Sequence, residues 1–268
     1  MRADRRLVAL DIDGTVLTED GTLNPPVRRA ILAARDRGHE VMLATGRSAA
    51  STIPVAEAIG IEPDYLVCAN GAVTLRRDAD APDGYRREFV ETFDPTEVLG
   101  TIRGAMSDAR YAVEDEEGFF RYTERFPAAA VGPAGEQVAY EDLLVVRATR
   151  VVVVSPSHAT EEFLGAVERM GLQRVSYAIG WTAWLDIAPD GVNKATAMER
   201  VRAALDVPRD RVVAAGDGRN DIDLLQWAAA EGVGAAMGQA PPEVQEVAGE
   251  VLPPVTADGL AVLLDRLP

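Results

Sequence analysis

Cysteine, histidine and long apolar runs are scarce in this sequence of 268 residues. The single cysteine, Cys68, excludes an internal disulfide and favours a reducing compartment. No cluster of histidine and cysteine offers the ligand set of a zinc site. Apolar runs such as 151–154 are far shorter than the roughly 20 residues that a membrane span needs. These absences argue against a disulfide-stabilised, zinc-binding or transmembrane protein.

Positive charge is also in short supply, because the formal net charge is −16 at pH 7. Nucleic acids and anionic membranes select surfaces rich in Lys and Arg, so neither is an expected partner. Arginines lie near the N-terminus, but Asp11 and Asp13 interrupt the apolar segment that follows them. A signal peptide needs a longer uninterrupted apolar region. We therefore expect a cytoplasmic protein.

Short apolar runs alternate with helix-like segments at both ends of the chain. Expected strands are 7–10, 41–44, 65–69 and 212–215, and expected helices are 25–37, 49–59, 194–205 and one from Asn220. Nearly continuous apolar strands separated by helices are typical of a parallel sheet that is covered on both faces. The sequence therefore predicts an α/β fold with a doubly wound, Rossmann-like parallel sheet.

The middle of the chain has a different pattern. Strand-like stretches occur at 86–92, 119–123, 151–154 and 183–188, with a helix at 160–170. Residues 81–188 are also the most acidic part of the chain. We interpret them as an inserted α+β cap domain, and residues 1–80 and 189–268 as the two halves of one catalytic core.

Polar residues follow several of the expected core strands. Asp11, Thr45, Asn70 and Asp217 each stand at or just after the end of an apolar run. Each alone could be a turn former. Because ligands of open parallel sheets bind at the carboxyl ends of the strands, the four together indicate a site.

Two carboxylates, Asp11 and Asp13, stand two residues apart, and Asp13 directly precedes a glycine. One reading is an Asx turn, and another is a calcium loop. A calcium loop requires a glutamate at its twelfth position, where this sequence has Thr22. Calcium is therefore excluded.

Four ordered motifs resemble those of the haloacid dehalogenase superfamily of phosphotransferases. They are Asp11-Ile-Asp13-Gly14-Thr15, Thr45-Gly46-Arg47, Lys194 and the segment 216–221, Gly-Asp-Gly-Arg-Asn-Asp. The insertion between the second and third motifs resembles the Cof-type branch, which carries an α+β cap of the C2 type. Ala195 and Gln239 depart from residues usual in relatives, and neither change removes a catalytic group.

The resemblance implies covalent phosphoryl transfer. Asp11 would attack phosphorus and form an aspartyl-phosphate, and Asp13 would act as general acid and base. The resemblance also assigns phosphate or substrate binding to Thr45, Gly46, Arg47, Lys194 and Asn220. Arg47 could reach either the substrate or the cap.

The resemblance further implies a Mg²⁺ cofactor, which suits a site made of oxygen ligands. The implied ligands are the carboxylates of Asp11 and Asp217 and the backbone carbonyl of Asp13, and Asp221 would support metal-bound water. Seen alone, Asn220 and Asp221 could instead cap the helix that follows them.

Lys194 has support that is independent of the resemblance, because it is the only lysine among 27 basic residues. A compact ammonium beside a phosphoryl group is something that arginine cannot supply.

We therefore expect a Mg²⁺-dependent phosphatase of small phosphate monoesters, as a monomer or homodimer. The acidic cap disfavours a second phosphate, so sugar or polyol phosphates are the preferred substrates. A sugar phosphomutase and a catalytically silent phosphosugar-binding protein remain alternatives.

A few polar and aromatic residues have no expected role in the chemistry. His39 and His158 are predicted to be solvated loop residues, and the run 114–117 a solvated turn. Trp181 and Trp184 are expected to pack the cap, although one of them could line the substrate pocket.

Overall fold

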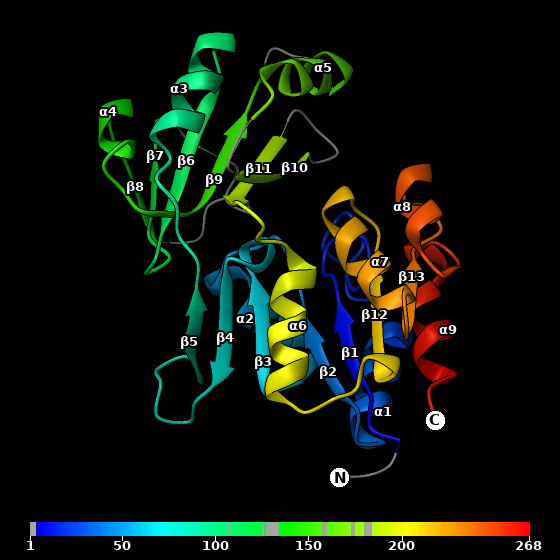
Figure 1. The fold of residues 1–268 in the computed structure, drawn as a ribbon. Helices are drawn as coiled ribbons and strands as arrows, with labels where there is room; N and C mark the ends of the chain where they lie inside the picture. Colours follow the sequence, from blue (N-terminus) through cyan, green and yellow to red (C-terminus); the bar gives the residue numbers. More distant parts are fainter. Residues whose placement is uncertain are drawn as a thin grey trace.

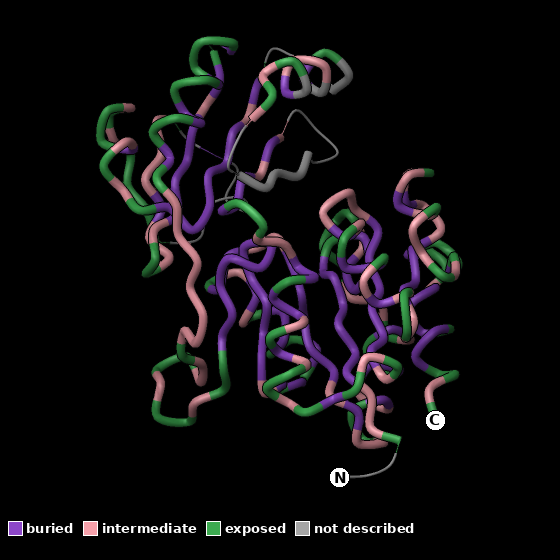
Figure 2. Tube along the Cα trace, in the orientation of Figure 1, coloured by how far each residue is buried: buried purple, intermediate pink, exposed green. Residues whose placement is uncertain are grey.

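The chain folds around two main β-sheets, one above the other in the view of Figure 1. This computed structural model describes residues 4–106, 108–124, 126, 134–156, 160–172, 175–179 and 184–268. Figure 2 shows that buried residues follow the strands of both sheets, while exposed residues lie on the outer sides of the helices and in turns.

The lower sheet is parallel throughout, with the strand order β14-β13-β12-β1-β2. Its strands are β1 (Leu7–Leu10), β2 (Glu40–Leu43), β12 (Val212–Gly216), β13 (Val233–Ala236) and β14 (Glu250–Val251). Every residue of β1 and β12 is buried, which explains why both strands are continuous apolar runs in the sequence.

Helices cover both faces of this sheet, so the predicted doubly wound fold is confirmed. One face packs on α1 (Pro25–Asp36), α2 (Ala49–Ile59) and α9 (Gly259–Asp265). The other packs on α6 (Lys194–Ala204), α7 (Ile222–Ala229) and α8 (Pro242–Val247). Short 3₁₀ turns lie at η1 (Ala69–Gly71), η2 (Arg209–Arg211), η3 (Arg219–Asp221) and η4 (Val255–Ala257). Among the residues described, no helix has the length and apolar character needed to cross a membrane.

A three-stranded antiparallel sheet leads from the lower sheet to the upper one. It contains β3 (Tyr65–Cys68), β4 (Val73–Arg77) and β5 (Tyr85–Val90). An isolated parallel bridge between Ala44 and Val67 places β3 beside the end of β2. The predicted boundary at residue 80 falls between β4 and β5. The exact division into core and cap remains a prediction.

The upper sheet belongs to the α+β insertion and has the order β10-β11-β9-β6-β7-β8. Its strands are β6 (Arg110–Asp115), β7 (Phe120–Tyr122), β8 (Gly135–Gln137), β9 (Ala148–Val154), β10 (Val175–Ile179) and β11 (Trp184–Pro189). Helices α3 (Thr96–Ala105) and α5 (Thr160–Met170) share a hydrophobic cluster with one face of this sheet, and α4 (Tyr140–Leu143) lies near β6 and β7. The predicted strands and the helix at 160–170 are present, while β6, β8, β10, α3 and α4 were not predicted.

Two residues that were expected in solvent are buried. The His39 ring accepts a hydrogen bond at Nδ1 from the Arg6 N–H, at 3.2 Å, and its Nε2 donates to the Pro268 carbonyl, at 2.9 Å. Glu114 lies on β6 rather than in a turn, with 1% of its surface exposed. The predictions for His39 and Glu114 were wrong because neighbours distant in sequence bury these side chains, whereas Glu116 and Glu117 lie in the exposed turn that was predicted. His158 and Trp181 lie outside the described residues, and the half-buried Trp184 packs edge-on against Phe126.

Candidate active site

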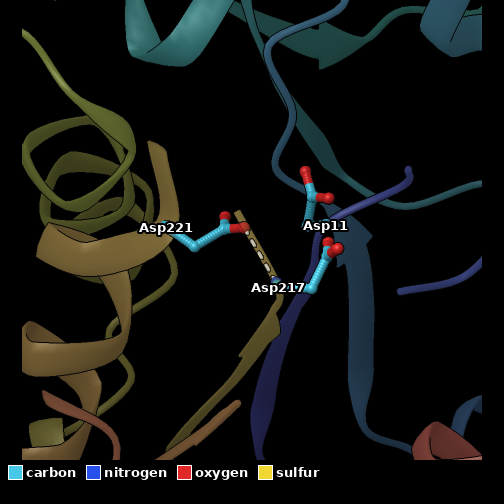
Figure 3. A group of neighbouring side chains, drawn as sticks. All are labelled: Asp11, Asp217 and Asp221. Carbon is cyan, nitrogen blue, oxygen red and sulfur yellow. Dashed lines mark hydrogen bonds between the residues drawn. The ribbon is translucent and has the colours of Figure 1, made fainter. Parts of the chain in front are cut away.

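Three aspartates meet at the carboxyl ends of β1 and β12. Asp11 follows β1, Asp217 follows β12, and Asp221 ends η3. Figure 3 shows the carboxylates of Asp11 and Asp217 next to each other, with Asp221 approaching from the side of α7. One carboxylate oxygen from each residue lies within 4.8 Å of the others, and all three residues are buried. The edge predicted from the sequence is therefore an acidic site.

Lys194 supplies the positive charge inside this group. It is the first residue of α6, its side chain is 0% exposed, and its Nζ donates to Asp11 Oδ1 at 2.7 Å and to Asp221 Oδ1 at 2.6 Å. Burial alone would lower the pKa of the ammonium, but the charges of Asp11 and Asp221 outweigh burial and raise the pKa. Lys194 therefore stays charged across the physiological range.

One ammonium does not neutralise three carboxylates. Burial, followed by the charge of Asp221, raises the pKa of the Asp11 carboxyl well above its usual value. The same two causes raise the pKa of Asp217 to about 7. A hard divalent cation such as Mg²⁺ would remove this repulsion, and it prefers oxygen ligands of this kind. The donor set therefore fits the implied cofactor.

The hydrogen bonds of Asp221 distinguish it from the other two aspartates. Its Oδ2 accepts from the backbone N–H groups of Asp217 and Gly218, at 3.1 and 3.0 Å, while Oδ1 is bonded to Lys194. Its side chain makes no capping bond to α7. Asp221 thus accepts three hydrogen bonds, one of them from an ammonium, whereas the two that Asp217 accepts come from neutral side chains at 3.2 and 3.3 Å. Asp11 and Asp217 are therefore the carboxylates better placed to bind a cation directly.

Thr45, Gly46 and Asn220, three of the residues expected to hold phosphate, lie close to one another. Thr45 is buried, and its Oγ1 accepts the Arg47 N–H at 3.1 Å. Asn220 Nδ2 donates to Asn70 Oδ1 at 3.0 Å, and the N-cap position of α7 is Asp221 rather than Asn220. A Cβ added to Gly46 would lie 3.0 Å from the same Asn70 oxygen. Thr45, Gly46 and Asn220 therefore lie together, as expected, and Asn70 is a neighbour that the motifs did not name.

Asp13 differs from the other motif carboxylates because its side chain is 61% exposed. Arg47 clamps it with two hydrogen bonds, one from Nε to Oδ2 at 2.8 Å and one from Nη2 to Oδ1. In this structure Arg47 therefore holds the expected general acid and base, an arrangement that the sequence did not predict.

Thr15 and Gln239 orient Asp217, and neither was among the predicted site residues. Thr15 Oγ1 donates to Asp217 Oδ1 at 3.2 Å, and Gln239 Nε2 donates to Asp217 Oδ2 at 3.3 Å. Gln239 Nε2 also donates to the Gly14 carbonyl at 2.6 Å. The only sequence signal for Gln239 was that it departs from the usual residue of relatives.

Gly14 is held against Asp217 so tightly that a side chain cannot fit. Its φ is +80°, and an added Cβ would lie 2.1 Å from Asp217 Oδ2. We expect Gly14→Ala to displace Asp217 and to abolish most of the enzymatic activity. Gly21→Ala is the matched control, because Gly21 has a φ of +82° and no atom of the described residues lies within 4 Å of an added Cβ. Both variants should lose roughly 1–2 kcal/mol of unfolding free energy from the left-handed backbone. Equal activity of the two variants would contradict the steric role.

Comparison with known protein families agrees with the motifs. The chain matches the haloacid dehalogenase-like hydrolase family over residues 8–264. It is 26% identical over 273 aligned residues to the 5-amino-6-(5-phospho-D-ribitylamino)uracil phosphatase YitU of Bacillus subtilis (strain 168), covering 96% of each chain. It is 28% identical over 276 residues to the pyridoxal phosphate phosphatase YbhA of Escherichia coli (strain K12), again covering 96% of each.

Solved structures resemble the whole chain, including the insertion. The sugar phosphatase BT4131, of subclass IIB of the superfamily, superposes with a TM-score of 0.81 at 19% identity and covers 97% of this chain and 98% of its own. The phosphatase BT1666 of Bacteroides thetaiotaomicron gives a TM-score of 0.76 at 24% identity and covers 100% of this chain and 97% of its own. The fold and the resemblance predicted from the sequence are confirmed, and the chain belongs to the haloacid dehalogenase-like hydrolases.

Proposed function

We propose that this hydrolase is a Mg²⁺-dependent phosphatase of small phosphate monoesters that reacts through an aspartyl-phosphate on Asp11. The observation that carries the proposal is the contact of Asp11 with Lys194 at the end of β1, beside Asp217. An anionic nucleophile can approach an anionic ester only where fixed positive charge offsets their repulsion. Lys194 supplies part of that charge, and Mg²⁺ bound by Asp11 and Asp217 would supply the rest.

Each protein group has one task in the proposed reaction. The Asp11 oxygen that is not bonded to Lys194 attacks phosphorus, while Lys194, Thr45 and Asn220 bind the equatorial oxygens of the transferred group. Asp13 donates a proton to the leaving oxygen and later accepts one from the attacking water. Its exposed carboxyl can reach a leaving group above the site once Arg47 releases it. The role of Arg47 is then to hold Asp13 in place before substrate binds.

The relatives support a small organic substrate. YitU and YbhA are named for phosphate esters of a ribitylamino compound and of pyridoxal. We propose sugar or polyol phosphates as the preferred substrates of this chain. The assignments of a cytoplasmic location and of a monomer or homodimer rest on the sequence alone.

Phosphate release from a panel of esters tests the proposal. We expect turnover with Mg²⁺ and a loss of at least about 100-fold when a chelator removes the cation, because its charge acts in the transition state. Phosphate should appear free in solution and not relocated on the sugar, which separates a phosphatase from a phosphomutase. Full turnover in chelator, or no release from any ester, would refute the proposal.

A further inference from the structure

Glu114 is a buried carboxylate that the proposed reaction does not use. Its surface is 1% exposed, and neither Oε1 nor Oε2 has a hydrogen-bond partner among the residues that the structure describes. Burial raises the pKa of this carboxyl to about 7. Buried polar groups are normally hydrogen-bonded, and an unpartnered one is costly enough to need an explanation.

Arginines approach Glu114 from two sides without bonding to it. Arg150 lies directly opposite on β9, and its Nε donates to Asp186 Oδ1 at 2.6 Å. Arg87, on β5, has a buried Nη1 that likewise lacks a partner in the described part of the chain. A Cβ placed on Gly118 would lie 2.4 Å from Arg87 Nη2 and 3.7 Å from Glu114 Oε1. The guanidinium of Arg87 and the carboxylate of Glu114 therefore face the same small region beside the β6–β7 turn, and each group carries a buried atom that no described residue satisfies.

This region belongs to the sheet face that α3 and α5 leave uncovered. Residues alternate along β6, so Val113 packs into the cluster of α3 and α5 while Glu114 points to the opposite face. Asp186 lies on that same face. It pairs with Val152 of β9, and Val152 is two residues from Arg150, so both point to the same side of the sheet.

The same end of the upper sheet approaches the candidate active site. β11 contacts η1, which contains Asn70, and β10 contacts η3, which contains Asn220. Figure 1 shows β11 running down to the start of α6, where Lys194 lies. Glu114 and Arg87 are also close enough to Cys68, the last residue of β3, for their charges to act on its thiol.

We infer that Glu114 and Arg87 form a subsite for a hydroxyl group of the leaving alcohol, so that the enzyme selects polyhydroxylated phosphate esters. This inference rests on the proposed phosphatase function. A hydroxyl can donate to Glu114 and accept from Arg87 at once, which satisfies both unpartnered groups. A second phosphate is disfavoured, because the charges of Arg87 and Arg150 are offset by Glu114 and Asp186.

Two esters of equal carbon number test the subsite. Sorbitol 6-phosphate carries hydroxyls on its leaving group, and n-hexyl phosphate carries none. We expect Glu114→Met to lower kcat/KM for sorbitol 6-phosphate by roughly 10- to 100-fold, the usual effect of losing a hydrogen bond to a charged group. Turnover of n-hexyl phosphate should stay unchanged. Glu114→Gln keeps an acceptor oxygen, so its kcat/KM for sorbitol 6-phosphate should lie between those of the wild type and Glu114→Met.

Glu136→Met is the matched control, because Glu136 is an exposed glutamate on β8 of the same sheet, and it should leave both esters unaffected. Thermal unfolding at pH 8 serves as a second measurement. The melting temperature of Glu114→Met should equal or exceed that of the wild type, because the variant removes a buried carboxylate that has no hydrogen-bond partner among the described residues.

Three outcomes overturn the inference. They are an equal effect of Glu114→Met on both esters, no effect on either, and a wild type that prefers n-hexyl phosphate. If the wild type releases phosphate from neither ester nor from any other in the panel, the proposed function itself fails and the subsite fails with it.

Discussion

Replacing Asp11 by asparagine is expected to reduce phosphate release by about 10⁴-fold or more, the scale seen when a catalytic nucleophile is removed. The amide keeps the shape of the side chain but is a poor nucleophile and carries no charge for a cation. Lys194 would still be paired with Asp221, at 2.6 Å. The measurement is release of phosphate in Mg²⁺, at enzyme concentrations high enough to detect residual turnover.

Loss of activity must be separated from loss of folding. In chelator, Asp11→Asn should be at least as stable as wild type, because burial and the neighbouring carboxylates raise the pKa of Asp11 and so make its ionised form costly. That cost appears as pH rises above the unfolded pKa of about 4, so the stability gain should be present at pH 7 and fade at pH 4. Asp36→Asn, an exposed change on α1, is the control for both measurements. If Asp11→Asn released phosphate as fast as the wild type, Asp11 could not be the nucleophile.

The parallel sheet could be predicted because burial on both faces leaves a continuous apolar run for each strand. β1 begins and ends at the predicted residues, 7 and 10. The edge of the sheet that carries the site lies where the apolar runs of the strands end. The convergence of Asp11 and Asp217 needed only the rule that parallel strands end at one edge.

Contacts between distant segments could not be predicted. The clamp of Arg47 on Asp13 joins residues 34 positions apart, and the Gln239 bond to Asp217 depends on the loop after β13. Glu114 looked like part of a solvated acidic turn, because nothing in the local sequence shows the arginines that surround it. Strand β6 was missed for the same reason, since its charged residues hide its apolar alternation.

The ion pairs of Lys194 combine both kinds of information. Its composition signal, a single lysine in an arginine-rich chain, could be seen in the sequence. Its contact with Asp221 could not, because that contact depends on α6 lying beside η3 and α7. The structure thus explains the unusual residue choice, because the Lys194 side chain is fully buried and two carboxylates bond to the same small ammonium.

Lys194→Met should therefore cost both stability and activity. Breaking a buried ion pair by removing one partner typically costs about 3–5 kcal/mol, because the remaining carboxylates are left uncompensated. We expect a loss of that order in the free energy of unfolding, measured by denaturant in chelator, together with loss of phosphate release. Mg²⁺ should restore part of the stability, because it offsets the charge of Asp11 and Asp217, without restoring turnover.

Lys194→Arg tests shape at constant charge. The planar guanidinium is larger than the ammonium, and the site is 0% exposed, so we expect overpacking to cost roughly 1–3 kcal/mol. Turnover should fall by about 100-fold, because the guanidinium cannot occupy the position of Nζ between Asp11 and Asp221. Arg202→Lys is the matched exchange on the same helix, where the ion pair with Glu199 is partly exposed and the change should stay within about 1 kcal/mol. If Lys194→Arg behaves like Arg202→Lys, positive charge alone is sufficient, and the full burial of the side chain is not the reason for a lysine at this position.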